Sequence, residues 1–216
     1  MPRQADPELE QRILDAACRL WGRGGEKALT MRAVAKAACT TTPTIYERYR
    51  DREDILRALR LKTRDELFSA IRGSHTLRHA CERYLQFALR HPHAYGVLFD
   101  GVARPPSLHE PWPSFNFFRN RLAERLGGTP REYTRLMLSL WSLMHGTALL
   151  IIDGDFTGRL RTQMIHACLD AFEALVREKG LIGRVRSGPA WPAGLVLGEG
   201  SDSKIFLRRR KRQRVN

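Results

Sequence analysis

Two short helical patterns within residues 30–56 constrain the fold of this chain more than any other feature. Val34 and Ala35 supply the apolar positions of the first pattern, and Ile45 and Tyr49 supply those of the second. A short polar break of cysteine and threonines separates them. Two helices joined by a turn of three or four residues form a helix-turn-helix, whose second helix can enter the major groove of DNA. The second pattern is rich in hydroxyls and arginine, which suit phosphate oxygens and base edges.

Apolar residues recur at spacings of three and four along the chain to about residue 180, and no stretch alternates as a strand does. The sequence therefore predicts an all-α protein. Thr30 and Asp51 are expected to cap helices, and Thr129-Pro130 is expected to open one. The expected helices span 7–21, 31–38, from 41 or 42 onward, 51–71, 76–90, 94–99, 114–126, 129–152 and 159–179.

Three segments are predicted from this pattern. Residues 1–56 would form an N-terminal three-helix bundle that contains the helix-turn-helix. Residues 57–182 would form a larger helical domain. Residues 183–216 are Gly-, Pro- and Ser-rich and then Arg-rich, which indicates a disordered basic tail.

The charge of the chain lies largely in that tail. The net charge is +14, and residues 181–216 contribute +7 of it through 9 Lys/Arg against 2 Asp/Glu. A basic protein favours a polyanionic partner, but the helix-turn-helix region is only mildly basic. One alternative therefore stays open, a membrane- or RNA-associated helical protein that acts through the Arg-rich residues 204–216. A solvated tail without a dedicated role is another.

The four cysteines, Cys18, Cys39, Cys81 and Cys168, are scattered and form no C-x-x-C pair. This spacing argues against a disulfide framework and against a zinc site, and it favours a reducing, cytoplasmic compartment. The N-terminus carries charges where a secretion signal would need an apolar run. We expect no metal and no cofactor.

The most apolar helix, 136–152, has to be weighed as a membrane span. Its 17 residues are at the lower limit of length, and they include Ser139, Ser142 and His145. A buried helix of a core or a subunit interface is the better interpretation, and no membrane is expected. The sequence also lacks a nucleophile elbow, a phosphate-binding glycine loop and an H-E-x-x-H motif, so an enzyme is not expected.

Residues 12–56 resemble the DNA-binding domain of TetR-family (TetR/AcrR-like) transcriptional regulators. The shared residues are an apolar first helix, Thr30 at the start of the second helix, Val34-Ala35, Thr44-Ile45-Tyr46, Tyr49 and Arg52-Glu53. A segment from Leu140 to Gly146 is similar to a subgroup with a Trp-x-x-x-His-Gly signature, here Trp141 and His145-Gly146. Cys39 departs from the family, because glycine usually occupies this turn position. A left-handed backbone there would strain Cys39 by roughly 1 kcal/mol or more.

The resemblance implies a regulator, generally a repressor, that binds a palindromic operator as a homodimer. Ten residues would contact DNA, although Tyr46 alternatively belongs to the core and Thr41 alternatively only caps a helix. They are Thr30, Arg32, Thr41, Thr42, Pro43, Thr44, Tyr46, Arg48, Tyr49 and Arg52.

The resemblance further implies dimerisation through the helices at 130–153 and 158–179 and release from DNA by a small molecule, which the apolar helices suggest is apolar or aromatic. Core packing is the alternative role for every member of the candidate effector site, and His145 in particular is expected to be a core histidine. The candidates are Tyr84, Phe87, Phe99, Phe115, Phe118, Met137, Trp141, Met144 and His145.

Overall fold

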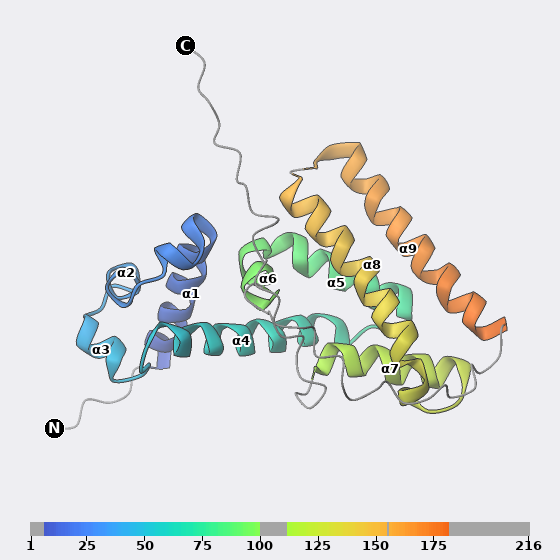
Figure 1. Cartoon of the computed structure of the whole chain (residues 1–216), viewed down its shortest axis with the longest axis horizontal. Helices are drawn as coiled ribbons and strands as arrows, with labels where there is room; N and C mark the ends of the chain where they lie inside the picture. Colours follow the sequence, from blue (N-terminus) through green and yellow to red (C-terminus); the bar gives the residue numbers. More distant parts are fainter. Residues whose placement is uncertain (1–6, 100–111, 155, 182–216) are drawn as a thin grey trace, which may run out of the picture. The chain divides into compact units, whose positions relative to one another are not determined.

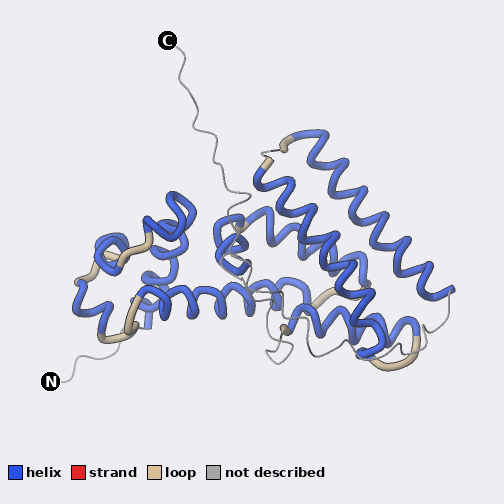
Figure 2. The backbone as a smooth tube through the Cα atoms, viewed as in Figure 1, coloured by secondary structure: helices blue, strands red, loops and turns tan. Residues whose placement is uncertain are grey.

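The computed structural model describes residues 7–99, 112–154 and 156–181. Every regular element in these ranges is helical, as Figures 1 and 2 show, so the prediction of an all-α protein is confirmed. The elements are α1 (Pro7–Gly24), η1 (Gly25–Ala28), α2 (Met31–Ala37), α3 (Thr42–Tyr46), α4 (Arg52–Arg72), α5 (Leu77–Arg90), α6 (Pro92–Phe99), α7 (Pro113–Leu126), η2 (Pro130–Tyr133), α8 (Thr134–Asp153) and α9 (Gly158–Leu181).

Side-chain caps set the starts of four helices. The side chains of Thr30, Thr41, Asp51 and Thr76 each accept a hydrogen bond from a backbone N–H of the following first turn. These bonds satisfy donors that a helix start leaves without an intrahelical partner. The starts predicted at Thr30 and Asp51 are therefore confirmed.

Several predicted boundaries differ by a few residues; α1, for example, ends at Gly24 rather than at residue 21. The short apolar helix begins at Pro92 rather than at residue 94, because proline fits the first helical position, where no N–H is needed. Thr129 and Glu132 form the expected capping box, but the turn that they open is the 3-10 segment η2, and α8 starts only at Thr134. The basic tail that the sequence predicts lies outside the described residues.

The N-terminal core joins α1, α2, α3 and the first half of α4. Ile13 of α1, Val34 of α2, Ile45 of α3 and Ile55 of α4 are completely buried in it. Val97 of α6 enters the same core, although it lies 38 residues beyond Leu59, the last α4 residue of that core. The helix-turn-helix thus rests on a packed core that α6 completes.

The second core joins the rest of α4 to α5, α6, α7, α8 and α9. Its largest buried side chains are Tyr84, Tyr95, Phe118 and Phe172, which come from four different helices. Because α4 buries residues up to Leu59 in the first core and Leu67 and Ile71 in the second, one continuous helix connects the two.

Residues 130–153 form the single stretch of the described chain that is long and apolar enough to cross a membrane. A core helix of a water-soluble protein has the same composition. Leu140, Met144 and Ala148 on one side of α8 are fully buried against the second core. This packing accounts for the apolar character of α8 without a lipid environment.

Candidate nucleic-acid interface and aromatic cluster

The turn between α2 and α3 depends on Cys39. Its backbone is left-handed, with a φ of 53°, and it is the one non-glycine residue of the described chain with a positive φ. The N–H of Cys39 donates to the carbonyl of Lys36 at 3.3 Å, and the N–H of Thr40 donates to that of Ala35 at 2.9 Å. These two bonds form a Schellman motif, which ordinarily places glycine at this position. The strain expected for Cys39 is therefore present.

Helix α3 is short, and two anchors hold it. Ile45 is fully buried, and Tyr49 in the following turn is only 6% exposed. Their spacing of four residues places them on one face. Pro43 and Tyr46 are exposed on the remaining surface, and the Tyr46 side chain is 55% exposed. The alternative that Tyr46 belongs to the core is therefore wrong.

Tyr49 does not belong with the other predicted DNA contacts. Its side chain is buried in the N-terminal core, and its hydroxyl makes no hydrogen bond of good geometry. Burial, with the Glu10 carboxylate nearby, raises the pKa of Tyr49 to about 12. Because this ring faces inward together with Ile45, its role is to fix α3 on the core.

The threonines around the start of α3 serve as caps. The Thr41 hydroxyl accepts from the Thr44 N–H at 3.4 Å and lies 2.8 Å from the Thr44 hydroxyl. Thr30 caps α2 by accepting from the Ala33 N–H at 3.1 Å. Thr30 and Thr41 stay exposed, while Thr42 and Thr44 are half-buried. The residues that cap α2 and α3 are therefore exposed to solvent at the starts of these helices.

The three predicted arginines differ in their partners. Arg52 forms ion pairs with Glu26 at 2.7 Å and Glu53 at 3.0 Å, so carboxylates already occupy its guanidinium. Arg32 is exposed and Arg48 is half-buried, and neither has a carboxylate partner within the described residues. Of the three predicted arginines, Arg32 and Arg48 are therefore the ones available to a polyanion.

A hydrogen-bonded chain of three side chains crosses the second core. The Tyr84 and Tyr95 hydroxyls lie 2.8 Å apart, and the Tyr95 hydroxyl lies 2.7 Å from Nδ1 of His145. Burial lowers the pKa of His145, because a charged imidazolium is poorly solvated there. The hydrogen bond to Tyr95 holds the His145 ring at the edge of this core, where the ring is half-buried rather than enclosed.

Aromatic rings surround the imidazole of His145. The Phe99 ring centroid lies 4.4 Å away, and Trp141 stacks on the imidazole at 5.3 Å with an interplanar angle of 18°. Trp112 stacks on Phe99 at 6.0 Å, and Tyr95 packs on Phe99 at 4.8 Å. We call Tyr84, Tyr95, Phe99, Trp112, Trp141 and His145 the aromatic cluster.

Four of the nine predicted effector residues lie in this cluster, namely Tyr84, Phe99, Trp141 and His145. The others pack elsewhere in the same core or at its edge: Phe87 against His91, Phe115 under Arg119, Phe118 against Phe172, and Met137 and Met144 fully buried on α8. Sequence reasoning missed Tyr95 and Trp112. The sequence did indicate Tyr95, because it lies four residues before Phe99 on a short apolar helix and therefore shares a face with it.

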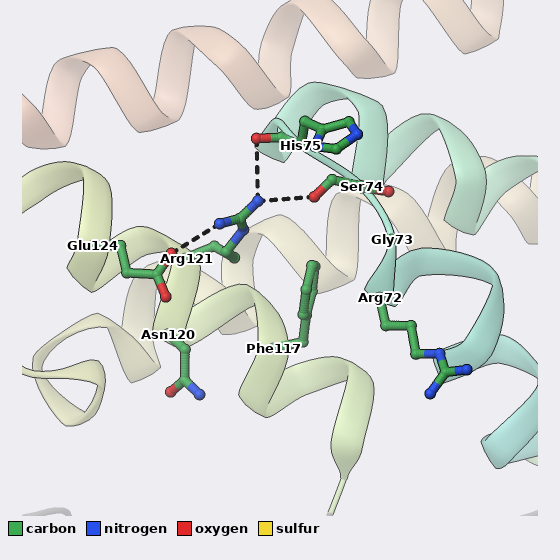
Figure 3. Close-up of a pocket in the computed structure, with 8 residues that line it drawn as sticks. All are labelled: Arg72, Gly73, Ser74, His75, Phe117, Asn120, Arg121 and Glu124. Atoms are coloured by element: carbon green, nitrogen blue, oxygen red, sulfur yellow. Dashed lines mark hydrogen bonds and ion pairs between the residues drawn. The ribbon is translucent and has the colours of Figure 1, made fainter.

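Two open hollows on the described surface contain none of the predicted effector residues. The hollow in Figure 3 has a volume of about 380 Å³ and lies beside Arg121. That guanidinium donates to the carbonyls of Ser74 at 2.8 Å and His75 at 3.1 Å and pairs with Glu124 at 3.0 Å. Arg121 therefore fixes the turn between α4 and α5 and is not free for a ligand. Within the described ranges, no group of three or more His, Cys, Asp or Glu side chains gathers as metal ligands.

Solved structures that share this fold include three TetR regulators. A TetR-like transcriptional regulator from Rhodococcus sp. RHA1 is 19% identical with a TM-score of 0.58, and the match covers 84% of this chain and 100% of that one. A TetR-family regulator from Streptomyces coelicolor is 19% identical with a TM-score of 0.56, covering 79% and 98%. A TetR variant from Acinetobacter baumannii AYE in complex with minocycline is 17% identical with a TM-score of 0.54, covering 82% and 97%.

Sequence comparison identifies the two halves of the chain separately. No curated protein matches the sequence significantly. Residues 13–59 match the family model for bacterial regulatory proteins of the tetR family. Residues 77–178 match the model for the tetracyclin repressor-like C-terminal domain. With both domains present in the order of that family, the chain belongs to the TetR family of transcriptional regulators.

Proposed function

We propose that this DNA-binding regulator is a homodimeric repressor that binds a palindromic operator and leaves it when a small apolar or aromatic molecule binds. The observation that carries the proposal is the position of α6, which contributes to both cores. Val97 packs with the helix-turn-helix, while Tyr95 and Phe99 of the same short helix pack in the aromatic cluster. A ligand that displaced α6 at one end would therefore disturb the support of the DNA-reading unit.

The contacts to DNA in this proposal come from α2, α3 and the residues beside them. Thr30, Arg32, Thr41 and Tyr46 are exposed there, and Arg48 lies two residues after the end of α3. Arg48 is the candidate for a bidentate contact with guanine, and the hydroxyls suit phosphates. Thr42, Pro43, Thr44 and Arg52 complete the proposed interface, while Tyr49 supports it from the core.

Dimerisation would follow from the apolar surface of α8 and α9, which pack on each other. Leu138 and Leu150 on α8 are 46% and 59% exposed, and Leu160 and Leu175 on α9 are 48% and 39% exposed. Exposed leucines concentrated on two neighbouring helices indicate a contact surface. Two copies of this pair would form a four-helix bundle. One short recognition helix reads few bases, so a two-fold dimer on two half-sites supplies the missing affinity and specificity.

The proposed domains keep the bounds predicted from the sequence. Residues 1–56 would bind DNA, residues 57–182 would bind the effector and dimerise, and 183–216 would form a basic tail. The minocycline complex of the Acinetobacter baumannii relative supports a small-molecule ligand for this chain. We further propose a cytoplasmic location and no catalytic activity.

DNase footprinting and gel shifts on the DNA upstream of the gene for this protein test the proposal. We expect a protected palindrome, and we expect Arg48→Ala to weaken specific binding by roughly 10- to 100-fold. Arg131→Ala, an exposed arginine in η2, is the matched control and should leave binding unchanged. If deletion of residues 204–216 abolishes binding while Arg48→Ala has no effect, the alternative that depends on the basic tail replaces this proposal.

A further inference from the structure

The hydrogen bonds of the aromatic cluster determine which nitrogen of His145 carries the proton. A neutral imidazole carries one proton, on Nδ1 or on Nε2, and the ring nitrogen without it can only accept. If Tyr84 donates to Tyr95, and Tyr95 donates to Nδ1 of His145, both tyrosine hydroxyl protons have an acceptor. Nδ1 then serves as the acceptor, and the proton of the neutral imidazole lies on Nε2.

The opposite direction of donation, from His145 toward the tyrosines, leaves one proton without an acceptor. If Nδ1–H of His145 donated to Tyr95, the protons of Nδ1, Tyr95 and Tyr84 would share only two hydrogen bonds. One of the two tyrosine hydroxyls would then keep a proton without an acceptor among the described residues. Tyr84 and Tyr95 are 2% and 0% exposed, so bulk water does not reach either hydroxyl. An unsatisfied buried donor is costly, which favours the order that ends in an Nε2–H.

That N–H has no partner within the described part of the chain, since the hydrogen bond of His145 to Tyr95 uses Nδ1. The imidazole is half-buried, and so are its neighbours Phe99, Trp112 and Trp141. No Asp, Glu, Lys or Arg side chain of the described residues hydrogen-bonds to His145 or Tyr95. The site therefore combines flat apolar rings with one neutral donor.

We propose that Nε2–H of His145 donates a hydrogen bond to the carbonyl oxygen of a neutral, planar aromatic ligand that packs against Phe99, Trp112 and Trp141. This inference rests on the proposed function, because it names the chemical class of the effector. A carboxylate is disfavoured because a neutral imidazole alone would have to compensate its desolvation. A cation is disfavoured because the described residues supply a donor to this site and no carboxylate that pairs with His145 or Tyr95. Tyr84 and Tyr95 act as positioning residues that fix the tautomer.

Two measurements on the full-length protein test this inference. The first is the tautomer of His145, read from long-range 1H–15N correlation spectra of 15N-histidine-labelled protein and assigned with His145→Gln. We expect the Nε2–H form in the free wild-type protein and a loss of that fixed tautomer in Tyr95→Phe. An Nδ1–H form in the wild type overturns the inference.

The second measurement compares three probes by tryptophan fluorescence titration: 2-acetylnaphthalene, 2-ethylnaphthalene and 2-naphthoate. We expect the ketone to bind about tenfold more tightly than the hydrocarbon, which is the effect of one neutral hydrogen bond. That preference should disappear in His145→Phe, which keeps a ring but removes the donor. Equal affinities in the wild type, absence of ketone binding, or tighter binding of the carboxylate each overturn the inference.

The two hypotheses, the aromatic-ketone ligand and the ligand-released repressor, can fail independently. If operator DNA is bound and some other class of molecule releases it, the regulator proposal stands and the aromatic-ketone class is wrong. If the ketone binds with the expected preference and never weakens operator binding, the ligand site stands and the release mechanism is wrong.

Discussion

Gly22 of α1 lies so close to His93 of α6 that a Cβ added at Gly22 would be 2.4 Å from Cγ of the imidazole. Helix α6 is therefore seated on the DNA-binding unit at two points, here and at Val97, whose carbonyl accepts a hydrogen bond from Nε of Arg60 at 3.3 Å. This seating connects the core beneath the helix-turn-helix to the helix that carries Tyr95 and Phe99. The contact between α6 and the N-terminal core can therefore be tested by mutation, without a ligand.

Gly22→Ala should push α6 away from α1 and lower the free energy of unfolding by about 1–2 kcal/mol, the usual cost of overpacking. Urea denaturation followed by circular dichroism measures it. Gly96→Ala on α6 is the matched control, since an added Cβ there meets nothing within 4 Å. That control should stabilise the protein by roughly 0.5–1 kcal/mol, because alanine favours the helix. In the double variant with His93→Ala, the penalty at Gly22 should disappear; an undiminished penalty would show that His93 is not its cause.

Cys39→Gly should stabilise the protein by about 0.5–1 kcal/mol, because glycine adopts the left-handed backbone of this turn without the Cβ clash. Cys39→Ala separates conformation from thiol chemistry, since alanine retains the Cβ. We expect urea unfolding to give unchanged stability for the alanine variant and a higher midpoint for the glycine variant. Equal midpoints for both variants would mean that the left-handed strain is already relieved in the native turn.

Tyr49→Phe and Tyr46→Phe should separate core packing from DNA contact. Tyr49 buries a hydroxyl without a good hydrogen bond, so its removal should leave the stability unchanged or slightly higher and should not alter operator affinity. Tyr46 is exposed, so its removal should leave stability unchanged and weaken operator binding. Urea denaturation and gel shifts of both variants measure these effects. A stable Tyr49→Phe protein with weakened DNA binding would restore Tyr49 to the interface.

Much of the fold was predictable because its signals are local. The caps at Thr30 and Asp51 and the spacing of Ile45 and Tyr49 depend on residues within one or two turns of each other. The same spacing already indicated that Tyr49 faces inward, and the family resemblance placed it among the DNA contacts instead. The sequence alone thus contained the correct evidence for that residue.

The aromatic cluster was predictable only in part, because its members come from different helices. Tyr84, Tyr95 and His145 lie on α5, α6 and α8, and periodicity indicates that each faces a core without saying which side chains meet there. The hydrogen-bonded order of the two tyrosines and the histidine depends on how these helices cross. That information is tertiary, and no short-range pattern carries it.

His145 should make the protein less stable in acid. Burial lowers its pKa, so the folded protein resists a protonation that the unfolded chain accepts below about pH 6.5. The unfolded state therefore binds more protons there, and the free energy of unfolding falls as the pH drops through this range. His145→Gln, which keeps an acceptor for Tyr95, should flatten that dependence between pH 5 and 7. Tyr84 and Tyr95 are the titratable neighbours, and both have raised pKa values far above this window. Identical pH profiles for the variant and the wild type in urea unfolding would contradict the prediction.

Leu150→Glu should break the proposed dimer. Leu150 is 59% exposed on α8, so the single subunit tolerates a polar side chain there, whereas two facing copies would bury the new carboxylates against apolar surface. Light scattering coupled to size-exclusion chromatography should show a monomer with wild-type helicity, and operator affinity should fall because one recognition helix reads too few bases. Leu61→Glu on α4 is the matched control, since Leu61 is 45% exposed but lies outside α8 and α9. A Leu150→Glu protein that stays dimeric, or a Leu61→Glu protein that dissociates, would place the interface on a different surface of the chain.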